Sequence, residues 1–293
     1  MLKNVSYIIF KIVIFLDFII YKFFNKNLKY YVYDYLRNSN FVTIKFKDSS
    51  NINLFCPSSM SKMRAEKFYS KEPITIEWID NFNSSKEKQI IFWDIGANVG
   101  TFSIYSALTH KNIEVHAFEP STSNLVLLSK NISLNNLSDH ISINQLPLTD
   151  RSSENKHLLM REKRFVEGGA QNSFGVNMDY NGDLFKSKTE YKILGTSIDY
   201  MIEKKILDLP DYIKIDVDGI EHFILSGAKE TLKEKKIKSV LIEINENFLD
   251  QFENCKKVLL EAGFEFKKKD FASSKENKSK YQNMFNYIYE RKF

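Results

Sequence analysis

Short apolar runs alternate along the chain with segments of helical periodicity. The runs have the length and composition of strands buried on both faces of a sheet, and they lie at 90–93, 114–118, 141–146, 211–215 and 239–244. After the second run, Leu125, Leu128 and Ile132 recur at helical spacing, which predicts a helix. This alternation predicts an α/β fold with a doubly wound, mostly parallel sheet. Two more segments, 265–269 and 284–289, are candidates for a hairpin-like pair around a polar loop at 273–280.

The first 30 residues are unusually apolar, but Lys11, Asp17 and Lys22 interrupt the run from Val5 to Phe24. A central Asp or Lys costs a membrane-spanning helix about 2.5–3.5 kcal/mol, and each large apolar residue returns only about 0.3–0.6 kcal/mol. Spanning is therefore marginal. The lysines favour a helix whose residues 1–26 lie on an anionic membrane surface, with packing on the protein's own surface as the alternative.

The compartment follows from the same segment. No A-x-A-like cleavage site follows the apolar run, which argues against a secretory signal. We expect a cytoplasmic protein, with peripheral attachment to the inner face of the plasma membrane as a further expectation.

Residues 31–87 are expected to form an annex that covers one edge of the sheet. The stretch 41–46 alternates between apolar and polar residues, and 51–55 follows after a short polar turn, which predicts a hairpin. A short helix is expected from Lys62 to Phe68 and a polar connection from Asn81 to Gln89. The chain thus divides into an N-terminal helix over 1–30, the annex, and a main domain over 88–293.

The first strand of the main domain runs into Asp94-Ile-Gly-Ala-Asn-Val-Gly100. Gly96 and Gly100 let the backbone turn sharply and approach a ligand without a Cβ in the way, as nucleotide-binding turns do. The spacing matches neither G-x-G-x-x-G nor G-x-x-x-x-G-K-[ST]. It favours a ligand without phosphates, S-adenosylmethionine, whose ammonium Asp94 would contact directly or through water. An ordinary strand and turn without a ligand is the alternative.

A second acid ends the next strand, in Phe118-Glu119-Pro120. It follows the glycine turn by about twenty residues, where an acid accepts hydrogen bonds from the ribose hydroxyls of an adenosine. Pro120 suits the edge of the following helix. Together, the first strand, the glycine turn and this acid indicate an adenosine site.

Two later stretches, Ile215-Asp-Val-Asp-Gly-Ile-Glu221 and Ser226-Gly-Ala228, complete an ordered set of motifs. The set resembles the FkbM family of S-adenosylmethionine-dependent methyltransferases over residues 90–243, although the family more often has Glu where this chain has Asp218. The resemblance implies a Rossmann-like class I methyltransferase sheet of seven strands with one antiparallel edge strand. It also implies S-adenosylmethionine as cofactor, held by Asp94, Gly96, Ala97, Asn98, Gly100, Thr101, Glu119, Pro120, Asp150 and Asp216.

Within that set, Asp150 is expected near the adenine amino group, with a surface-loop acid as the alternative. Residues 167–175 are rich in glycine and small polar side chains, which predicts a mobile loop that closes over substrate. Phe174 would then cover the cofactor or the acceptor. A plain connecting loop is the alternative.

Acids stand at five predicted strand ends, where ligands of such sheets bind: Asp94, Glu119, Asp150, Asp216 and Glu243. Acids there fit O-methylation, because a group must accept the hydroxyl proton. Asp216 is the first candidate for that base, Glu243 the second, and His222 the third, as a possible relay on the adjoining helix. Asp216, Asp218 and Glu221 offer oxygen ligands to Mg²⁺, but the same acids suit a helix start, so no metal is favoured.

Other classes of function fit less well. The net charge of +5 permits anionic partners, but the chain has no Pro-Pro pair of the kind that adenine and cytosine N-methyltransferases use, and Cys56-Pro57 reverses the order of the cytosine C5 nucleophile. Nucleic acid is therefore not an expected partner. The sequence predicts O-methyl transfer to a small molecule or sugar, as in a surface glycan or glycolipid precursor. A catalytically inactive cofactor-binding or membrane-attached scaffold is one alternative, and a nicotinamide-dependent oxidoreductase is a weaker one.

Overall fold

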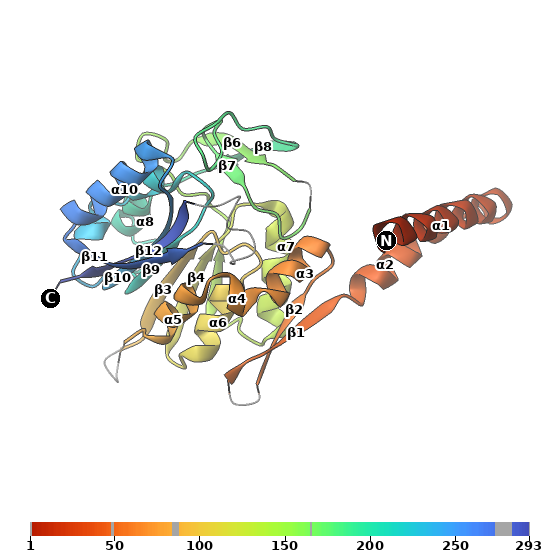
Figure 1. Ribbon diagram of the computed structural model, residues 1–293, viewed down its shortest axis with the longest axis horizontal. Helices are drawn as coiled ribbons and strands as arrows, with labels where there is room; N and C mark the ends of the chain where they lie inside the picture. Colours follow the sequence, from red (N-terminus) through yellow and green to blue (C-terminus); the bar gives the residue numbers. More distant parts are fainter. Residues whose placement is uncertain (1, 48–49, 84–87, 165, 273–282, 293) are drawn as a thin grey trace.

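The computed structural model describes residues 2–47, 50–83, 88–164, 166–272 and 283–292. Its centre is a seven-stranded sheet in the order β11-β12-β10-β9-β3-β4-β5 (Figure 1). These strands are β3 (Ile90–Ile95), β4 (Ile113–Phe118), β5 (Ile141–Asn144), β9 (Tyr212–Ile215), β10 (Ser239–Asn245), β11 (Phe264–Phe271) and β12 (Met284–Arg291). The strands from β10 to β5 are parallel, so the predicted doubly wound sheet is confirmed.

The one strand that runs against its neighbours is β12. It pairs antiparallel with both β10 and β11, so it lies one place in from the edge rather than at the edge. Helix α10 (Leu249–Glu261) leads from β10 to β11 at the outer edge. The chain then returns as β12 and fills the place between them, which forms the expected hairpin-like pair.

The sheet separates two apolar cores, because successive side chains of a strand point to opposite faces. Phe92 packs in the core with α5 (Pro73–Asp80), α6 (Thr101–Thr109) and α7 (Thr122–Leu134). Trp93, the next residue, packs on the other face with α8 (Ile198–Glu203), α9 (Glu221–Ser226), the short 3-10 helix Thr231–Lys233 and α10. Both aromatic side chains are fully buried.

A second sheet of three strands, in the order β7-β6-β8, was not predicted. It consists of β6 (His157–Glu162), β7 (Asn172–Phe174) and β8 (Thr189–Leu194). Met160 of β6 and Phe174 of β7 line a cavity together with Phe118, the last residue of β4. The small sheet therefore covers the carboxyl end of the main sheet, and part of the stretch expected as a loop is strand β7.

The annex forms the predicted hairpin, β1 (Phe41–Lys45) paired with β2 (Asn51–Phe55). Its first helix, α3 (Ser59–Glu66), begins three residues before the predicted Lys62 and is followed by α4 (Phe68–Lys71). The earlier start has a local cause, since the backbone N–H of Ser61 donates to the Ser58 hydroxyl at 3.0 Å and the two serines form a capping box.

The annex shares the core of the main domain. Leu54 of β2 is buried in the same cluster as Phe92, and the backbone N–H of Phe55 donates to Oδ1 of Asn131 on α7 at 2.7 Å. Part of the connection expected over 81–89, at 84–87, lies outside the described residues, as does the loop expected at 273–280.

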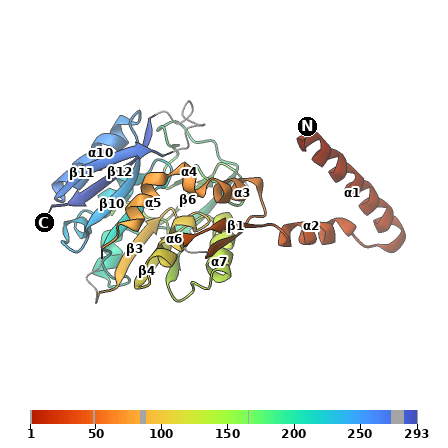
Figure 2. The ribbon, with the colours of Figure 1, turned by 60° about the horizontal axis from the view of Figure 1, so that its bottom comes forward.

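The N-terminal helices α1 (Leu2–Phe24) and α2 (Leu28–Asn38) form an arm that projects from the body (Figures 1 and 2). Asp17 is buried in the elbow between them, where its carboxylate accepts the backbone N–H of Lys29 at 3.0 Å and the side-chain amide of Asn27 at 3.3 Å. The hydrogen bond from Lys29 lowers the pKa of Asp17.

Much of the exposed surface of α1 is apolar. Ile8, Phe10, Phe15 and Phe18 are each more than half exposed. Within the described residues, no helix combines the length and the apolar content needed to cross a membrane. The alternative of packing on the protein's own surface is not what the structure has, because the arm stands away from the sheet (Figure 2).

Candidate active site

The glycine turn follows β3 and touches the end of the neighbouring strand. Gly96 has a φ of 85°, and a Cβ placed on it would lie 1.9 Å from the backbone oxygen of Asp216. Only glycine permits this approach. Gly100, with a φ of 86°, is the residue before α6, and a Cβ there would meet the Leu128 side chain at 2.6 Å. The turn therefore brings the ends of β3 and β9 together.

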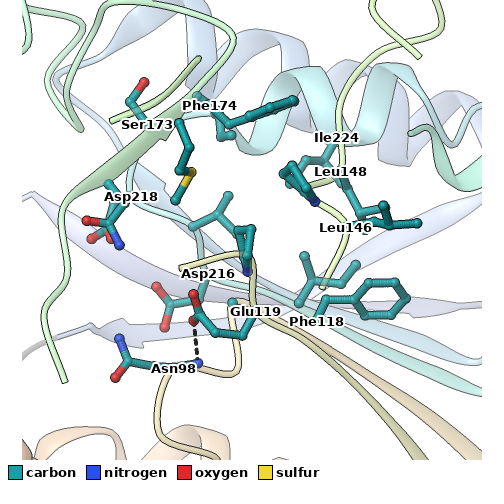
Figure 3. Close-up of a pocket in the computed structure, with 18 residues that line it drawn as sticks. Asn98, Phe118, Glu119, Leu146, Leu148, Ser173, Phe174, Asp216, Asp218 and Ile224 are labelled. Atoms are coloured by element: carbon teal, nitrogen blue, oxygen red, sulfur yellow. Dashed lines mark hydrogen bonds between the residues drawn. The ribbon is translucent and has the colours of Figure 1, made fainter. Parts of the chain in front are cut away.

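Two cavities open beside this turn. The smaller one, of about 60 Å³, is apolar at one end, with Phe118, Leu146, Leu148 and Ile224, and polar at the other, with Asn98, Glu119, Asp216 and Asp218 (Figure 3). The larger one holds about 330 Å³ and has a charged lining drawn partly from the annex. Four residues line both cavities: Gly96, Asn98, Asp216 and Asp218.

Glu119 is buried at the polar end of the smaller cavity. Its Oε2 accepts the backbone N–H of Asn98 at 2.8 Å, and its Oε1 accepts that of Ser121 at 2.8 Å. Burial raises the pKa of Glu119 to about 7, and the two backbone hydrogen bonds limit the rise. Each carboxylate oxygen has a second lone pair, so this acid can still accept ribose hydroxyls. Pro120 lines the same cavity.

Asn98 connects the glycine turn to the segment after β6. Its side-chain amide donates to the carbonyl oxygen of Gly169 at 2.7 Å. Its Oδ1 is buried and has no hydrogen-bond partner among the described residues. A buried acceptor without a partner is costly, so Oδ1 fits a donor brought by a ligand.

Asp94 does not reach either cavity. It is fully buried, and its Oδ2 accepts the hydroxyl of Ser103 at 2.6 Å while its Oδ1 lies 3.7 Å from Nζ of Lys214. The expected direct contact with the cofactor ammonium is therefore not what this geometry offers. The reason is the register of β3, which pairs Asp94 with Lys214 within the sheet instead of placing it at the strand end.

Lys214 is a site residue that sequence reasoning missed. Its ammonium lies 3.1 Å from Oδ2 of Asp216, and its side chain is 1% exposed. Burial lowers the pKa of Lys214, but the carboxylates of Asp216 and Asp94 outweigh that effect and hold it above its ordinary value. The signal was a lysine within an apolar strand, since a lysine is almost never fully buried unless it is paired.

Asp216 is one of the two acids that line both cavities. It is the residue after β9, and its carboxylate is about one fifth exposed. Burial raises the pKa of Asp216, but Lys214 and then Lys71 outweigh it, so the pKa lies below its ordinary value. Asp216 is therefore ionised at neutral pH and faces both cavities.

Asp218 and Glu221 have separate roles in the loop after β9. Asp218, at a φ of 65°, lines both cavities, and its Oδ2 accepts the backbone N–H of Gln171 at 2.6 Å. Burial, and then the charge of Asp216, raise the pKa of Asp218 to about 6. Glu221 instead binds its own loop, because it accepts the backbone N–H groups of Val217 and Gly219, each at 3.0 Å.

The alternative metal set of Asp216, Asp218 and Glu221 is thus not assembled. Glu221 is occupied by backbone amides, and within the described ranges no three His, Cys, Asp or Glu side chains are grouped to hold a metal ion.

The two other candidate bases lie in different places. Glu243 on β10 lines the larger cavity, and burial, followed by the charge of Asp216, raises its pKa well above the ordinary value. His222 lines neither cavity. Its ring lies 5.6 Å from that of Phe248, and burial lowers its pKa. The structure therefore brings Glu243 to the site and leaves His222 outside it.

Three residues expected at the cofactor, Ala97, Thr101 and Asp150, line neither cavity. Ala97 is buried and donates its backbone N–H to the carbonyl of Phe118 at 2.9 Å. Thr101 is the first residue of α6. Asp150 accepts the hydroxyl of Ser152 at 2.8 Å and closes its own turn. Its position gives the expected adenine contact no support, because a polar turn satisfies this carboxylate locally.

The stretch expected as a lid lies between the annex and the glycine turn. Arg64 donates its Nε–H to the carbonyl of Gly168 at 2.7 Å, and Ser58 donates its hydroxyl to the carbonyl of Glu167 at 2.6 Å. Further along, Phe174 is buried in the wall of the smaller cavity. The stretch is therefore held by the annex on one side, and Phe174 lies at the smaller cavity.

Comparison with known proteins identifies the class. The methyltransferase FkbM domain model matches residues 94–266, more than half of the chain, so the chain belongs to the FkbM methyltransferase family. The predicted resemblance and the Rossmann-like methyltransferase fold are confirmed. Membership of this family implies S-adenosylmethionine as the methyl donor.

The individual proteins that resemble this chain share less than a third of its residues. Methyltransferase sdnD of Sordaria araneosa is 29% identical over 202 residues, which cover 63% of this chain and 76% of that protein. The structure of methyltransferase FkbM from Methylobacillus flagellatus is 15% identical, covers 72% of this chain and 46% of that one, and has a TM-score of 0.44. Precorrin-6y C5,15-methyltransferase from Geobacter metallireducens is 13% identical, covers 76% and 87%, and also has a TM-score of 0.44.

Proposed function

We propose that this methyltransferase acts on a hydroxyl oxygen of a small molecule or sugar, as in a surface glycan or glycolipid precursor. The observation that carries the proposal is the junction of two cavities at Gly96, Asn98, Asp216 and Asp218. One cavity has the acid and apolar surface that an adenosine needs, and the other has room for an acceptor. A methyl group that passes between two ligands must cross at the shared residues, and two of these are carboxylic acids.

The residues around the smaller cavity fit the cofactor. Glu119 would accept the ribose hydroxyls, Phe118 and Leu148 would contact the adenine, and the buried Oδ1 of Asn98 would accept a donor of the cofactor. S-adenosylmethionine supplies an activated methyl group on a sulfonium when bound. The chain therefore mainly has to hold the acceptor oxygen in line with that group, and such positioning is worth roughly 7–11 kcal/mol of the barrier.

The smaller cavity must widen before it admits an adenine ring. Its volume of about 60 Å³ is below the roughly 150 Å³ that accommodates benzene in a protein core. Phe174, on the three-residue strand β7, forms part of its wall. We infer that β7 shifts when the cofactor binds, which retains the lid role expected for residues 167–175.

We assign three acids near the junction different roles in orienting the acceptor and in transferring its proton. Lys214 and then Lys71 outweigh the effect of burial and lower the pKa of Asp216, so this acid stays ionised and can orient the acceptor by accepting a hydrogen bond from a second hydroxyl beside the reacting one. Asp218, whose pKa is about 6, has the higher proton affinity of the two shared acids and is still ionised at neutral pH, as a general base requires. Burial, and then the charge of Asp216, raise the pKa of Glu243 well above its ordinary value, and in its protonated form this acid would donate a hydrogen bond to the acceptor.

Binding and product analysis separate this function from its rivals. We expect calorimetric titration to show binding of S-adenosylhomocysteine and none of NAD, whereas an oxidoreductase would bind NAD. A scaffold would bind the adenosyl ligand and methylate nothing. Mass spectrometry of cell-surface glycans with and without the gene should reveal a missing methyl group. No adenosyl binding at millimolar ligand would contradict the proposal.

We also propose that α1 attaches the enzyme to the cytoplasmic face of an anionic membrane. The exposed apolar surface of α1 supports this, as do the basic residues Lys3, Lys11 and Lys22. Asp17, the one acid of the helix, is turned into the elbow, so it does not oppose contact with anionic lipid.

A further inference from the structure

One face of the annex helices forms a wall of the larger cavity. Its members recur at i, i+3, i+4, i+7 and i+11, which is the spacing of a single helical face: Met60, Met63, Arg64, Lys67 and Lys71. Helix α3 ends at Glu66 and α4 begins at Phe68, so the face runs across both helices. Basic residues on a short helix ordinarily face solvent, but here three of them line the cavity.

The basic side chains are held close to the acids of the junction. Arg64 is fixed by its hydrogen bond to Gly168, and its charge helps to lower the pKa of Asp216. Lys71 pairs with the buried carboxylate of Glu72 and also interacts electrostatically with Asp216 and Glu243. The annex therefore brings cations to the place where an acceptor must lie.

The charges of this cavity do not balance. Its described lining includes four basic side chains, Arg64, Lys67, Lys71 and Arg164, and three acids, Asp216, Asp218 and Glu243. Glu72, the buried partner of Lys71, is a fourth carboxylate beside this lining. Burial, and then the charge of Asp216, raise the pKa of Glu243, which weakens its negative charge. The methionine end of the cofactor adds a carboxylate and an ammonium, which cancel, and the sulfonium adds one more positive charge. The excess is therefore positive.

We propose that the acceptor is an anion and that Arg64, Lys67, Lys71 and Arg164 bind its phosphate or carboxylate group. This inference rests on the proposed function, because it assigns the larger cavity to the acceptor. Arginine and lysine are the side chains that hold such groups through charge-assisted hydrogen bonds. The anion would lie against the annex wall, with the reacting hydroxyl directed to Asp218 and the second hydroxyl to Asp216.

The test uses the full chain saturated with S-adenosylhomocysteine and three sugar probes. Glucose 1-phosphate and glucuronate carry the two possible anions, and methyl glucoside is the neutral control. We expect measurable binding of one anionic probe and none of the neutral one. Arg64→Gln, Lys71→Gln and Arg164→Gln should each weaken the binding about tenfold. Lys62→Gln is the matched control, since Lys62 is exposed and pairs with Glu66 on the other side of α3.

The possible results separate a failure of the proposed function from a failure of the anionic-acceptor proposal. Wild-type protein that does not bind S-adenosylhomocysteine would contradict the proposed function itself. Normal binding of that ligand, with no probe bound or with the neutral probe bound as well as the anionic ones, overturns the anionic acceptor alone. Variants that lose S-adenosylhomocysteine but keep the probe would show that the basic face serves the cofactor carboxylate. Arg164 is exposed, so its variant gives a readout even if a buried substitution disturbs folding.

Discussion

The backbone N–H of Asn98 donates to Oε2 of Glu119 at 2.8 Å, which joins the glycine turn to the end of the next strand (Figure 3). The bond places the acid at the polar end of the smaller cavity and fixes the turn beside it. Any ligand that uses Glu119 is therefore held in a set position relative to Gly96 and Asp216, which lie at the same turn.

Replacing Glu119 by alanine should weaken binding of S-adenosylhomocysteine at least tenfold. The loss of charge-assisted hydrogen bonds to the ribose is the cause, at about 1.5–3 kcal/mol each. Calorimetry measures the affinity, and circular dichroism checks that the fold remains. Unchanged affinity in a folded variant would show that this acid serves only the turn.

Affinity for S-adenosylhomocysteine should also rise with pH. The pKa of Glu119 is raised to about 7, and only the ionised carboxylate can accept hydrogen bonds from both ribose hydroxyls. The ionised fraction grows about tenfold between pH 6 and pH 8, so affinity should rise by about the same factor. Glu119→Gln should bind weakly at both pH values, and a pH dependence that persists in this variant assigns the effect to another group.

Removing the buried ammonium should destabilise the protein. Lys214→Met leaves Asp94 and Asp216 without their shared partner, and breaking a buried ion pair typically costs about 3–5 kcal/mol. Urea unfolding followed by circular dichroism measures the loss. The double variant Lys214→Met with Asp94→Asn should recover part of it, because one uncompensated charge is removed. A loss below about 1 kcal/mol in the single variant would contradict the pairing.

Asp216→Asn and Asp218→Asn should fail in different ways once an acceptor is known. A general base contributes roughly 10²–10⁴-fold, so Asp218→Asn should lower kcat by about that factor and abolish a rise in rate through pH 6, the pKa of Asp218. Asp216→Asn should raise KM as well, because Asp216 orients the acceptor. EDTA should leave wild-type turnover unchanged. Full turnover in either variant removes that acid from the mechanism, and loss of activity in EDTA would restore the metal alternative.

Deleting residues 1–26 should release the protein from vesicles that contain anionic lipid. The wild type should bind these vesicles more weakly as salt is raised, since the lysines lose part of their attraction. It should bind vesicles of neutral lipid less well. The deletion variant should still bind S-adenosylhomocysteine, because α1 lies away from both cavities. Equal vesicle binding by both proteins, or resistance of the wild type to extraction with alkaline carbonate, would count against peripheral attachment.

The sequence by itself determined the parts that depend on neighbours in the chain. Apolar runs of strand length predicted β3, β4, β9 and β10, and Gly96 and Gly100 predicted the sharp turn after β3. Glu119 was found in the same way, because an acid immediately after a buried strand has to lie at the sheet edge where ligands bind. These signals are local, so a single chain segment carries each of them.

Only the tertiary structure decided which side chains meet. Asp94 and Asp216 look equivalent at two strand ends, but strand register buries the first beside Lys214 and leaves the second at the cavities. Likewise, Arg64 and Lys71 read as ordinary surface cations until the annex packs against the junction. The physical reason is that burial and ion pairing depend on contacts between residues far apart in the chain. These contacts set the free-energy cost of burying a charged side chain and shift its pKa.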